Sequence, residues 1–433
     1  MSLSKILPIG LMLFSFFFGA GNLIFPPILG QMAGDSITPA TIGFCLSGVG
    51  LPVLGVFVMA INHFRHPDEV GMPAGKMFSR VVIILCALSI GPLFAIPRTC
   101  ATSFSVGFLP LLSSDTEVWG LFVYSVIYFL ITLWMVMKPS RILDVCGKLM
   151  APLLLLLLVV LVAAVISSPM GAIGKVTDSY AVAPLVKGVF EGYNTMDALC
   201  SLLFGAAVVA AIQDLGIQSE NKLQKSTVFA GIIAGIALTL IYAALSYVGA
   251  QSVSVLGMVD NGAVLVQKVT YGYFGSFGAV IIAMTFFLAC VTTSVGLVTS
   301  ISAYFHSFMG EKCSYEKIAI VVIIFSTVVA NFGLSNIIKY SIPMLVMLYP
   351  IIIVMILLNI FPGLFRRNKS VFRGALWLTT LVAINDGLCC MGIKVFASCF
   401  SWLPFYDMGL GWVVPAVVGA LIGFADALCR CRN

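Results

Sequence analysis

The chain has 433 residues, of which 61% are hydrophobic and only 9% are charged. An ordinary soluble domain carries about 25% charged residues, so these charges are too few to cover a soluble protein of this size. The mean hydropathy of +1.11 also excludes a disordered chain. The composition therefore predicts an integral membrane protein that lies in a lipid bilayer.

The apolar residues come in long uninterrupted runs, such as residues 151–166. About 20 consecutive apolar residues cross a bilayer as a helix, whereas the strands of a membrane barrel alternate apolar and polar residues. We therefore expect an all-α membrane protein with about twelve transmembrane helices. The expected spans are residues 6–32, 38–62, 79–110, 118–137, 148–168, 185–213, 226–250, 274–305, 317–334, 340–362, 372–396 and 410–428.

The basic residues lie mainly on one side of these spans. If the N-terminus is cytoplasmic, 17 of the 23 lysines and arginines lie in cytoplasmic segments, 5 lie outside, and Arg98 lies within a span. The cytoplasmic set includes Arg366 and Arg367, and the outer set includes Lys394. This imbalance follows the positive-inside rule and predicts that both termini are cytoplasmic. It also explains the net charge of +6 without nucleic-acid binding.

Nothing in the sequence favours a membrane-embedded enzyme, and we expect no catalytic residues. The three histidines, His63, His66 and His306, fall at expected cytoplasmic ends of spans rather than at membrane depth. Most of the twelve cysteines lie in apolar runs, where cysteine behaves as a small hydrophobic residue. The classes of membrane protein that remain are transporters and channels.

The first span contains residues that interrupt a helix. Gly19, Gly21, Asn22 and the pair Pro26-Pro27 fall within nine residues. Inside lipid, the backbone groups freed by a break must be satisfied by protein, water or a ligand, so a break indicates a polar cavity. The alternative is a proline kink at the outer end of the span, with the glycines serving only for packing.

The sixth span has a similar interruption between residues 191 and 197, which includes Glu191, Asn194 and Asp197. Ionisable residues at this depth usually face the interior of a bundle or an aqueous path. The alternative is that residues 185–193 form an extracellular helix and that Asn194 and Asp197 cap the helix that follows.

The two interrupted helices begin two successive groups of five spans. Because five is odd, the second group is inverted relative to the first. Interrupted helices at matching positions of two inverted halves indicate the central site of a transporter. We therefore expect a single membrane transport domain over residues 1–433, with a first repeat over 1–168, a second over 185–362 and two additional helices over 372–428.

A half-helix that begins at membrane depth offers free N–H groups and suits a carboxylate, and one that ends there offers carbonyl oxygens for a cation. Gly19, Ala20 and Gly21 allow a ligand to approach the backbone closely. We expect a small zwitterion with an aliphatic side chain, because the neighbouring residues are largely apolar. The expected apolar neighbours are Phe17, Phe18, Leu23, Ile24, Tyr193 and Phe204, and the expected substrate-binding residues are Gly19, Ala20, Gly21, Asn22, Tyr193, Asn194 and Thr195.

The eighth span contains three consecutive hydroxyl side chains, Thr292, Thr293 and Ser294. Such hydroxyls often donate to carbonyls of the preceding turn of their own helix. Hydroxyl and carbonyl oxygens are also hard ligands of the kind that a monovalent cation binds. The sequence alone leaves both interpretations open.

Four motifs in this order resemble the bacterial branched-chain amino acid:cation symporter family, within the amino acid-polyamine-organocation superfamily. They are Gly19-Ala-Gly-Asn-Leu-Ile-Phe-Pro-Pro27, Gly91-Pro-Leu-Phe-Ala-Ile-Pro-Arg-Thr99, Tyr193-Asn-Thr-Met-Asp-Ala198 and Cys290-Val-Thr-Thr-Ser-Val-Gly296. The resemblance implies the LeuT-type fold of a 5+5 inverted repeat with broken helices 1 and 6. It also implies Na⁺-coupled import of leucine, isoleucine and valine across the bacterial inner membrane, or H⁺-coupled or exchange-type transport of small apolar amino acids.

The resemblance also implies a Na⁺ site. Its expected oxygens are the backbone carbonyls of Ser15, Phe18 and Ala289 and the hydroxyls of Thr292 and Thr293. Phe17 and Asn22 hold the positions of a second Na⁺ site, for which the sequence identifies no partners in spans 6 and 7. The oligomeric state also stays open.

Arg98 and Asp197 are expected to act in coupling or gating. Arg98 could form an ion pair with Asp197, anchor an outer gate, or extend to the membrane surface as a packing residue. Asp197 is the expected site of proton coupling if the protein uses H⁺. Asp386, outside the repeats, is expected to serve in packing or oligomer contacts.

Overall fold

The computed structural model describes residues 3–113, 116–217, 219–360, 368–393 and 397–432. All regular elements in these ranges are helices, so the all-α prediction is confirmed. Arg366, Arg367, Lys394 and the predicted repeat boundary at residue 362 lie outside the described residues.

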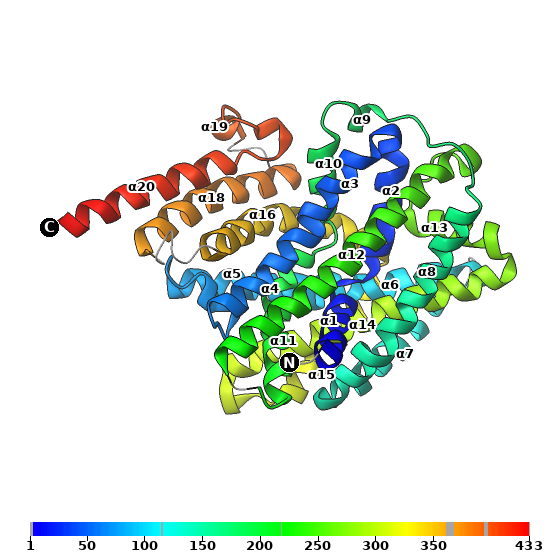
Figure 1. Cartoon of the computed structure of the whole chain (residues 1–433), viewed down its shortest axis with the longest axis horizontal. Coiled ribbons are helices and arrows are strands. Elements are labelled where there is room, and N and C mark those ends of the chain that lie inside the picture. Colours follow the sequence, from blue (N-terminus) through cyan, green and yellow to red (C-terminus); the bar gives the residue numbers. More distant parts are fainter. Residues whose placement is uncertain (1–2, 114–115, 218, 361–367, 394–396, 433) are drawn as a thin grey trace.

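The helices of the first repeat follow the five expected spans (Figure 1). The first span is divided into two helices, the second and third each contain a short π-helical stretch, and the fifth begins with one. The elements are α1 (Leu3–Phe17), α2 (Ala20–Ala33), α3 (Ile37–Cys45), α4 (Leu51–Ile61), α5 (Lys76–Leu88), α6 (Ala95–Gly107), α7 (Glu117–Val136) and α8 (Ala151–Ser167), with π-helical stretches over Leu46–Gly50, Ser89–Leu93 and Leu143–Met150.

The second repeat again begins with a divided helix. Its elements are α10 (Pro184–Tyr193), α11 (Asp197–Asp214), α12 (Glu220–Leu256), α13 (Gly262–Phe274), α14 (Ser276–Met309), α15 (Tyr315–Ala330) and α16 (Leu334–Ile360), and the short α9 (Asp178–Ala181) precedes it. Among the described residues, eight helical stretches are long and apolar enough to cross a membrane. The longest, Ala20–Ile61, combines α2, α3 and α4.

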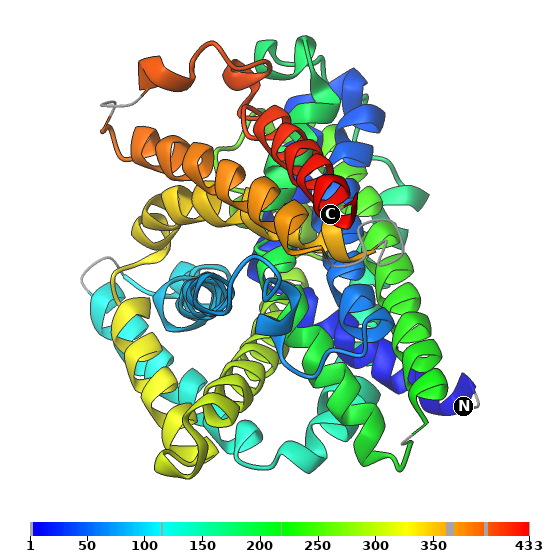
Figure 2. The same cartoon turned by 90° about the vertical axis from the view of Figure 1, so that its left-hand side faces the viewer.

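The last two spans form a pair at one side of the molecule. They are α18 (Lys369–Cys390) and α20 (Val413–Arg432), joined by a segment that contains α19 (Ala397–Phe400). α18 packs on α16 and α20 packs on α18, and the pair projects to the left of the main body in Figure 1 and faces the viewer in Figure 2.

Two local features of the structure are additional to the expected spans. The third span bends where Gly91 adopts non-helical angles (φ −86°, ψ −123°) directly before Pro92. The segment between the expected spans 7 and 8 contains the 13-residue helix α13. Gly262 brings α13 against α2, since a Cβ atom at Gly262 would lie 2.1 Å from the Ile24 carbonyl oxygen.

Close packing at small residues holds the broken helices to their neighbours. A Cβ atom on Gly30 of α2 would lie 1.8 Å from the Ser246 carbonyl oxygen of α12, and one on Gly249 would lie 1.9 Å from the Pro27 carbonyl oxygen. In the same way, a Cβ atom on Gly188 of α10 would lie 2.0 Å from the Ala40 carbonyl oxygen of α3. Such contacts are the usual basis of helix association in membranes, where lipid removes the hydrophobic driving force.

Candidate functional site

The first break lies at Phe18 and Gly19, between α1 and α2. Gly19 is extended (φ −114°, ψ −155°), and its N–H donates to Asn22 Oδ1 at 3.1 Å. Pro26 and Pro27 lie inside α2. The break is therefore at the glycine motif, and the alternative of a simple proline kink at the outer end is wrong.

The second break lies between Tyr193, where α10 ends, and Asp197, where α11 begins. Met196 has a positive φ of 69°, a conformation that residues other than glycine rarely adopt. α10 packs along α3 of the second span rather than standing free of the bundle. The predicted interruption of the sixth span is confirmed.

Arg98 of α6 bridges this second break. Its Nη1 donates to the Asn194 carbonyl oxygen at 2.8 Å and its Nη2 to the Thr195 carbonyl oxygen at 3.2 Å. The side chain is 4% exposed, so it does not extend to the membrane surface. Nor does it form an ion pair with Asp197, because the two lie more than 4 Å apart and the ion pairs among the described residues are elsewhere.

Asp197 joins three helices through its carboxyl group. Asn22 Nδ2 of α2 donates to Asp197 Oδ2 at 2.6 Å, and the Tyr242 hydroxyl of α12 donates to the same oxygen at 3.3 Å. Asn22 Nδ2 also contacts the Tyr242 hydroxyl. The sequence does not indicate Tyr242 as a site residue, because a tyrosine in an apolar helix carries no local signal of its partners.

The expected Na⁺ residues come from the end of α1 and the middle of α14. The Thr293 hydroxyl donates to the Ser15 carbonyl oxygen at 3.3 Å, and a Cβ atom on Gly19 would lie 2.8 Å from Thr293 Oγ1. The Thr292 hydroxyl instead donates within its own helix, to the Leu288 and Ala289 carbonyl oxygens at 2.9 and 3.1 Å. Phe18 and Ala289, like Ser15 and Thr292, are fully buried. These oxygens are hard ligands without a carboxylate, which fits a monovalent cation.

Ser294, the third hydroxyl of the motif, faces another group of helices. The Ser294 hydroxyl oxygen lies 2.6 Å from Thr99 Oγ1 of α6 and 2.9 Å from the Tyr128 hydroxyl oxygen of α7. The Tyr128 hydroxyl donates to Thr99 Oγ1 at 3.2 Å. All three side chains are buried. This network ties α14 to α6 and α7, so neighbouring hydroxyls of one motif serve different contacts.

A hollow of about 20 Å³ lies between the two breaks. It is lined by residues of α1, α2, α11, α14, the bent third span and the second break: Phe16, Phe17, Gly19, Ala20, Gly21, Asn22, Ile90, Ala95, Arg98, Thr99, Thr195, Met196, Asp197, Cys200, Thr293 and Leu297. Such a volume holds about one water molecule. An amino acid can therefore enter only if the helices or their side chains move.

Five of the seven expected substrate residues line this hollow, but Tyr193 and Asn194 do not. Tyr193 stacks on Tyr349 of α16 with ring centroids 4.2 Å apart, and Asn194 Nδ2 donates to Glu191 Oε2 at 3.1 Å. Where a helix is broken, neighbouring side chains point in different directions. Consecutive residues of one motif therefore do not share a cavity.

Of the expected apolar neighbours, only Phe17 lines the hollow. Phe204 packs behind it, with the two ring centroids 5.2 Å apart. The apolar lining residues that the sequence does not indicate include Phe16, Ile90, Ala95 and Leu297.

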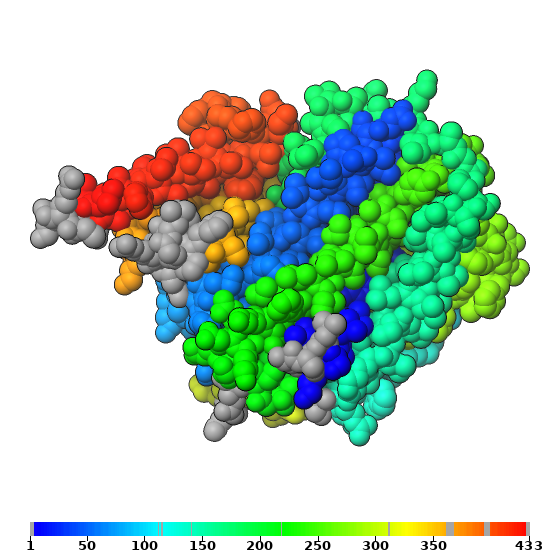
Figure 3. Space-filling model, in the orientation of Figure 1, coloured from blue at the N-terminus to red at the C-terminus, as the bar shows by residue number. Residues whose placement is uncertain are grey.

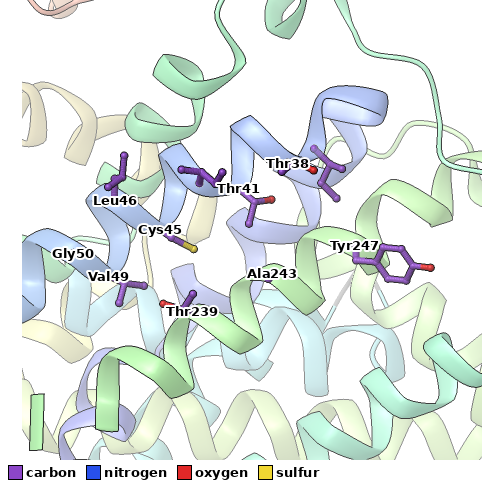
Figure 4. A pocket seen from close by; sticks show the side chains of 11 residues that line it. Thr38, Thr41, Cys45, Leu46, Val49, Gly50, Thr239, Ala243 and Tyr247 are labelled. Atoms are coloured by element: carbon purple, nitrogen blue, oxygen red, sulfur yellow. The ribbon is translucent and has the colours of Figure 1, made fainter. Parts of the chain in front are cut away.

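A larger groove of about 600 Å³ lies between α3 and α12, away from the breaks (Figure 4). Its walls are apolar or carry hydroxyl groups, and its lining residues Ile42 and Leu46 are about half exposed. The two helices lie side by side on the outer face of the molecule (Figure 3). Such an open apolar groove suits lipid hydrocarbon rather than a polar amino acid.

The sequence matches a family model described as branched-chain amino acid transport protein over residues 2–428. The branched-chain amino acid permease BrnQ of Bacillus subtilis is 39% identical over 435 residues, which cover 100% of this chain and 99% of that protein. BraB, a branched-chain amino acid permease of the same organism, is 40% identical over 97% of this chain and 95% of its own length. The branched-chain amino acid transport system 2 carrier protein of Pseudomonas aeruginosa is 39% identical over 96% of this chain and 94% of its own length.

Two solved structures share the fold. A Na⁺-coupled sialic acid symporter matches 96% of this chain and 89% of its own, with a TM-score of 0.62 and 16% identity. Mhp1, a nucleobase-cation-symport-1 family transporter, matches 96% of this chain and 91% of its own, with a TM-score of 0.56 and 14% identity. The fold is therefore the LeuT-type inverted repeat with broken helices 1 and 6. The chain belongs to the branched-chain amino acid transport protein family, whose members are transporters and not enzymes.

Proposed function

We propose that the protein imports leucine, isoleucine and valine together with Na⁺ by alternating access. The observation that carries this proposal is the meeting of two broken helices at one polar hollow inside an otherwise apolar bundle. Half-helix ends of this kind supply free N–H groups and carbonyl oxygens where lipid offers none. The permeases named above support the choice of substrates.

The substrate binds at the two breaks. The residues that contact the substrate directly are the expected ones that line the hollow: Gly19, Ala20, Gly21, Asn22 and Thr195. Tyr193 and Asn194 act from behind this lining, Tyr193 through its stacking on an α16 tyrosine and Asn194 through the carbonyl that receives Arg98.

Na⁺ is carried with the substrate, at the contact between α1 and α14. Its ligands are the carbonyl oxygens of Ser15, Phe18 and Ala289 and the hydroxyls of Thr292 and Thr293. The bond from Thr293 to Ser15 supports this assignment, because it brings oxygens of both helices together. A Na⁺-coupled symporter among proteins of the same fold is also consistent with it.

Proton coupling is the second candidate, and Asp197 favours it. Its carboxyl group is 3% exposed and lies at the second break, where it joins α2, α11 and α12. A carboxyl group buried in this way can exchange a proton when the helices around it move. In this version Asp197 is the coupling residue, and Arg98 holds the second break in shape as a gate.

The protein lies in the bacterial inner membrane with both termini in the cytoplasm. The excess of lysine and arginine on one side of the spans supports this orientation. Residues 1–168 and 185–362 form the two repeats of a single transport domain, and residues 372–428 add two peripheral helices.

Counterflow in proteoliposomes tests the proposal. Vesicles preloaded with unlabelled leucine should accumulate external labelled leucine transiently, and external isoleucine and valine should compete. Accumulation should require Na⁺ on both sides and should be absent from vesicles without protein. Counterflow that ignores Na⁺ and follows pH would replace Na⁺ with H⁺, and an absence of counterflow would refute a carrier.

A further inference from the structure

Arg98 has a donor that the surrounding protein does not use. Its two terminal nitrogens bind the Asn194 and Thr195 carbonyl oxygens, whereas Nε has no hydrogen-bond partner among the described residues. Arg98 is only 4% exposed, and Asp197 is not within ion-pair distance of it. A buried charge is costly unless it is paired, so an unpaired donor here indicates a missing acceptor.

The N-terminus of α2 lies beside this guanidinium. A Cβ atom on Gly21 would lie 3.1 Å from Arg98 Nη2, which places the arginine against the first turn of that helix. The first N–H groups of a helix have no partner within the helix and carry a partial positive charge. The Gly19 N–H is already bound to Asn22 Oδ1, but Ala20 and Gly21 of this first turn line the same hollow as Arg98, so two independent sources of positive charge converge on it.

We propose that Arg98, together with the first turn of α2, binds the carboxylate of the amino acid. This inference rests on the proposed function and deepens it, because it identifies the residue that makes the site depend on a carboxylate. Asp197 lines the same hollow without pairing with Arg98. The site therefore presents one cationic and one acidic group, which match the two ends of a zwitterion.

Arg98 also has a positioning role, because it holds the carbonyls of the second break, and the test must separate the two roles. Leucinamide provides the separation, since it keeps the side chain and amino group of leucine and lacks the carboxylate. In purified full-length protein, we would measure Kd for both ligands by competition with labelled leucine or by calorimetry. Wild type should prefer leucine strongly over leucinamide.

Arg98→Gln should weaken leucine binding by about 10- to 100-fold, which is the usual effect of losing a hydrogen bond to a charged group. Leucinamide binding should change much less, so the preference for leucine should collapse. Arg98→Lys should recover part of the preference, because it keeps the charge without the planar guanidinium. Arg80→Gln is the matched control, since Arg80 pairs with Asp68 away from the hollow, and it should keep the wild-type preference.

Gly21→Ala provides a second variant if Arg98→Gln does not fold. Its added methyl group would press on Arg98 Nη2 and should lower the preference for leucine without removing the charge. Equal weakening of leucine and leucinamide in both variants would overturn the proposal and leave Arg98 as a positioning residue only. Failure of the wild type to bind leucine would instead count against the proposed function.

Discussion

Thr293 places its hydroxyl between two helices, whereas Thr292 and Ser294 beside it face other partners. Thr293 donates to the Ser15 carbonyl of α1, Thr292 donates within α14, and Ser294 contacts Thr99 of α6. This difference is invisible in the sequence, where the three hydroxyls are consecutive. It makes Thr293 the most direct test of the proposed Na⁺ site.

Thr293→Ala should raise the Na⁺ concentration for half-maximal leucine uptake by about tenfold or more, because a charged ligand loses one oxygen. Uptake into proteoliposomes at varied Na⁺ concentration measures this. Thr293→Ser keeps the hydroxyl and should remain close to the wild type. Thr285→Ala is the matched control on the same helix, since the Thr285 hydroxyl donates only to the Ile281 carbonyl oxygen. An unchanged Na⁺ dependence in Thr293→Ala would rule out this residue as a ligand.

At the level of single residues, the sequence predicts the role of a residue where that role depends only on its neighbours in the chain. The first break could be inferred directly, because Gly19, Gly21 and Asn22 close together in an apolar span indicate an interruption, which the structure places at Phe18 and Gly19. Residues such as Tyr242 and Leu297 belong to the site only because tertiary packing turns them toward it. Their sequence surroundings resemble those of any buried residue in an apolar helix.

At the level of helices, α2 and α12 are in direct backbone contact, and this contact should be rigid. A Cβ atom on Gly249 would lie 1.9 Å from the Pro27 carbonyl oxygen. Gly249→Ala should therefore destabilise the protein by about 1–3 kcal/mol, the usual cost of overpacking. The melting temperature in detergent measures this effect.

Gly50→Ala is the control for this substitution. Gly50 lies on a membrane-crossing segment, and its added Cβ atom would have its nearest neighbour, the Cys45 carbonyl oxygen, at 3.7 Å. Its melting temperature should stay within about a degree of the wild type, as for most substitutions without a clash. Equal stability of both variants would mean that α2 and α12 can separate freely.

Helix existence was predictable because hydropathy and glycine or proline interruptions are properties of the sequence itself. The twelve expected spans correspond to helices or helix pairs of the structure, and the two breaks lie where the sequence places them. Hydropathy locates neither the bend at Gly91 nor the separate helix α13. Gly91 lies in a run that is apolar on both sides, and α13 is too short for a membrane span.

For the whole molecule, the broken helices link the proposed ion and substrate sites. Phe17 and Gly19 line the hollow, Gly19 packs against Thr293, and Thr293 bonds to Ser15. Residues 15–19 therefore belong to both sites. Binding of Na⁺ would order this segment, and the ordered segment would then also be in place to bind the amino acid.

Thermodynamic linkage turns this shared segment into a quantitative prediction. If saturating Na⁺ raises leucine affinity by some factor, leucine must raise Na⁺ affinity by the same factor, and couplings of this kind are typically about 5- to 150-fold. Calorimetry on the purified protein can measure leucine Kd with Na⁺ or choline, and Na⁺ Kd with and without leucine. Choline controls for ionic strength, because it is too large for a site of five oxygens. Leucine binding that does not depend on Na⁺ but changes with pH would instead indicate coupling to a proton on Asp197. Among the described residues, no other acidic side chain lines the hollow.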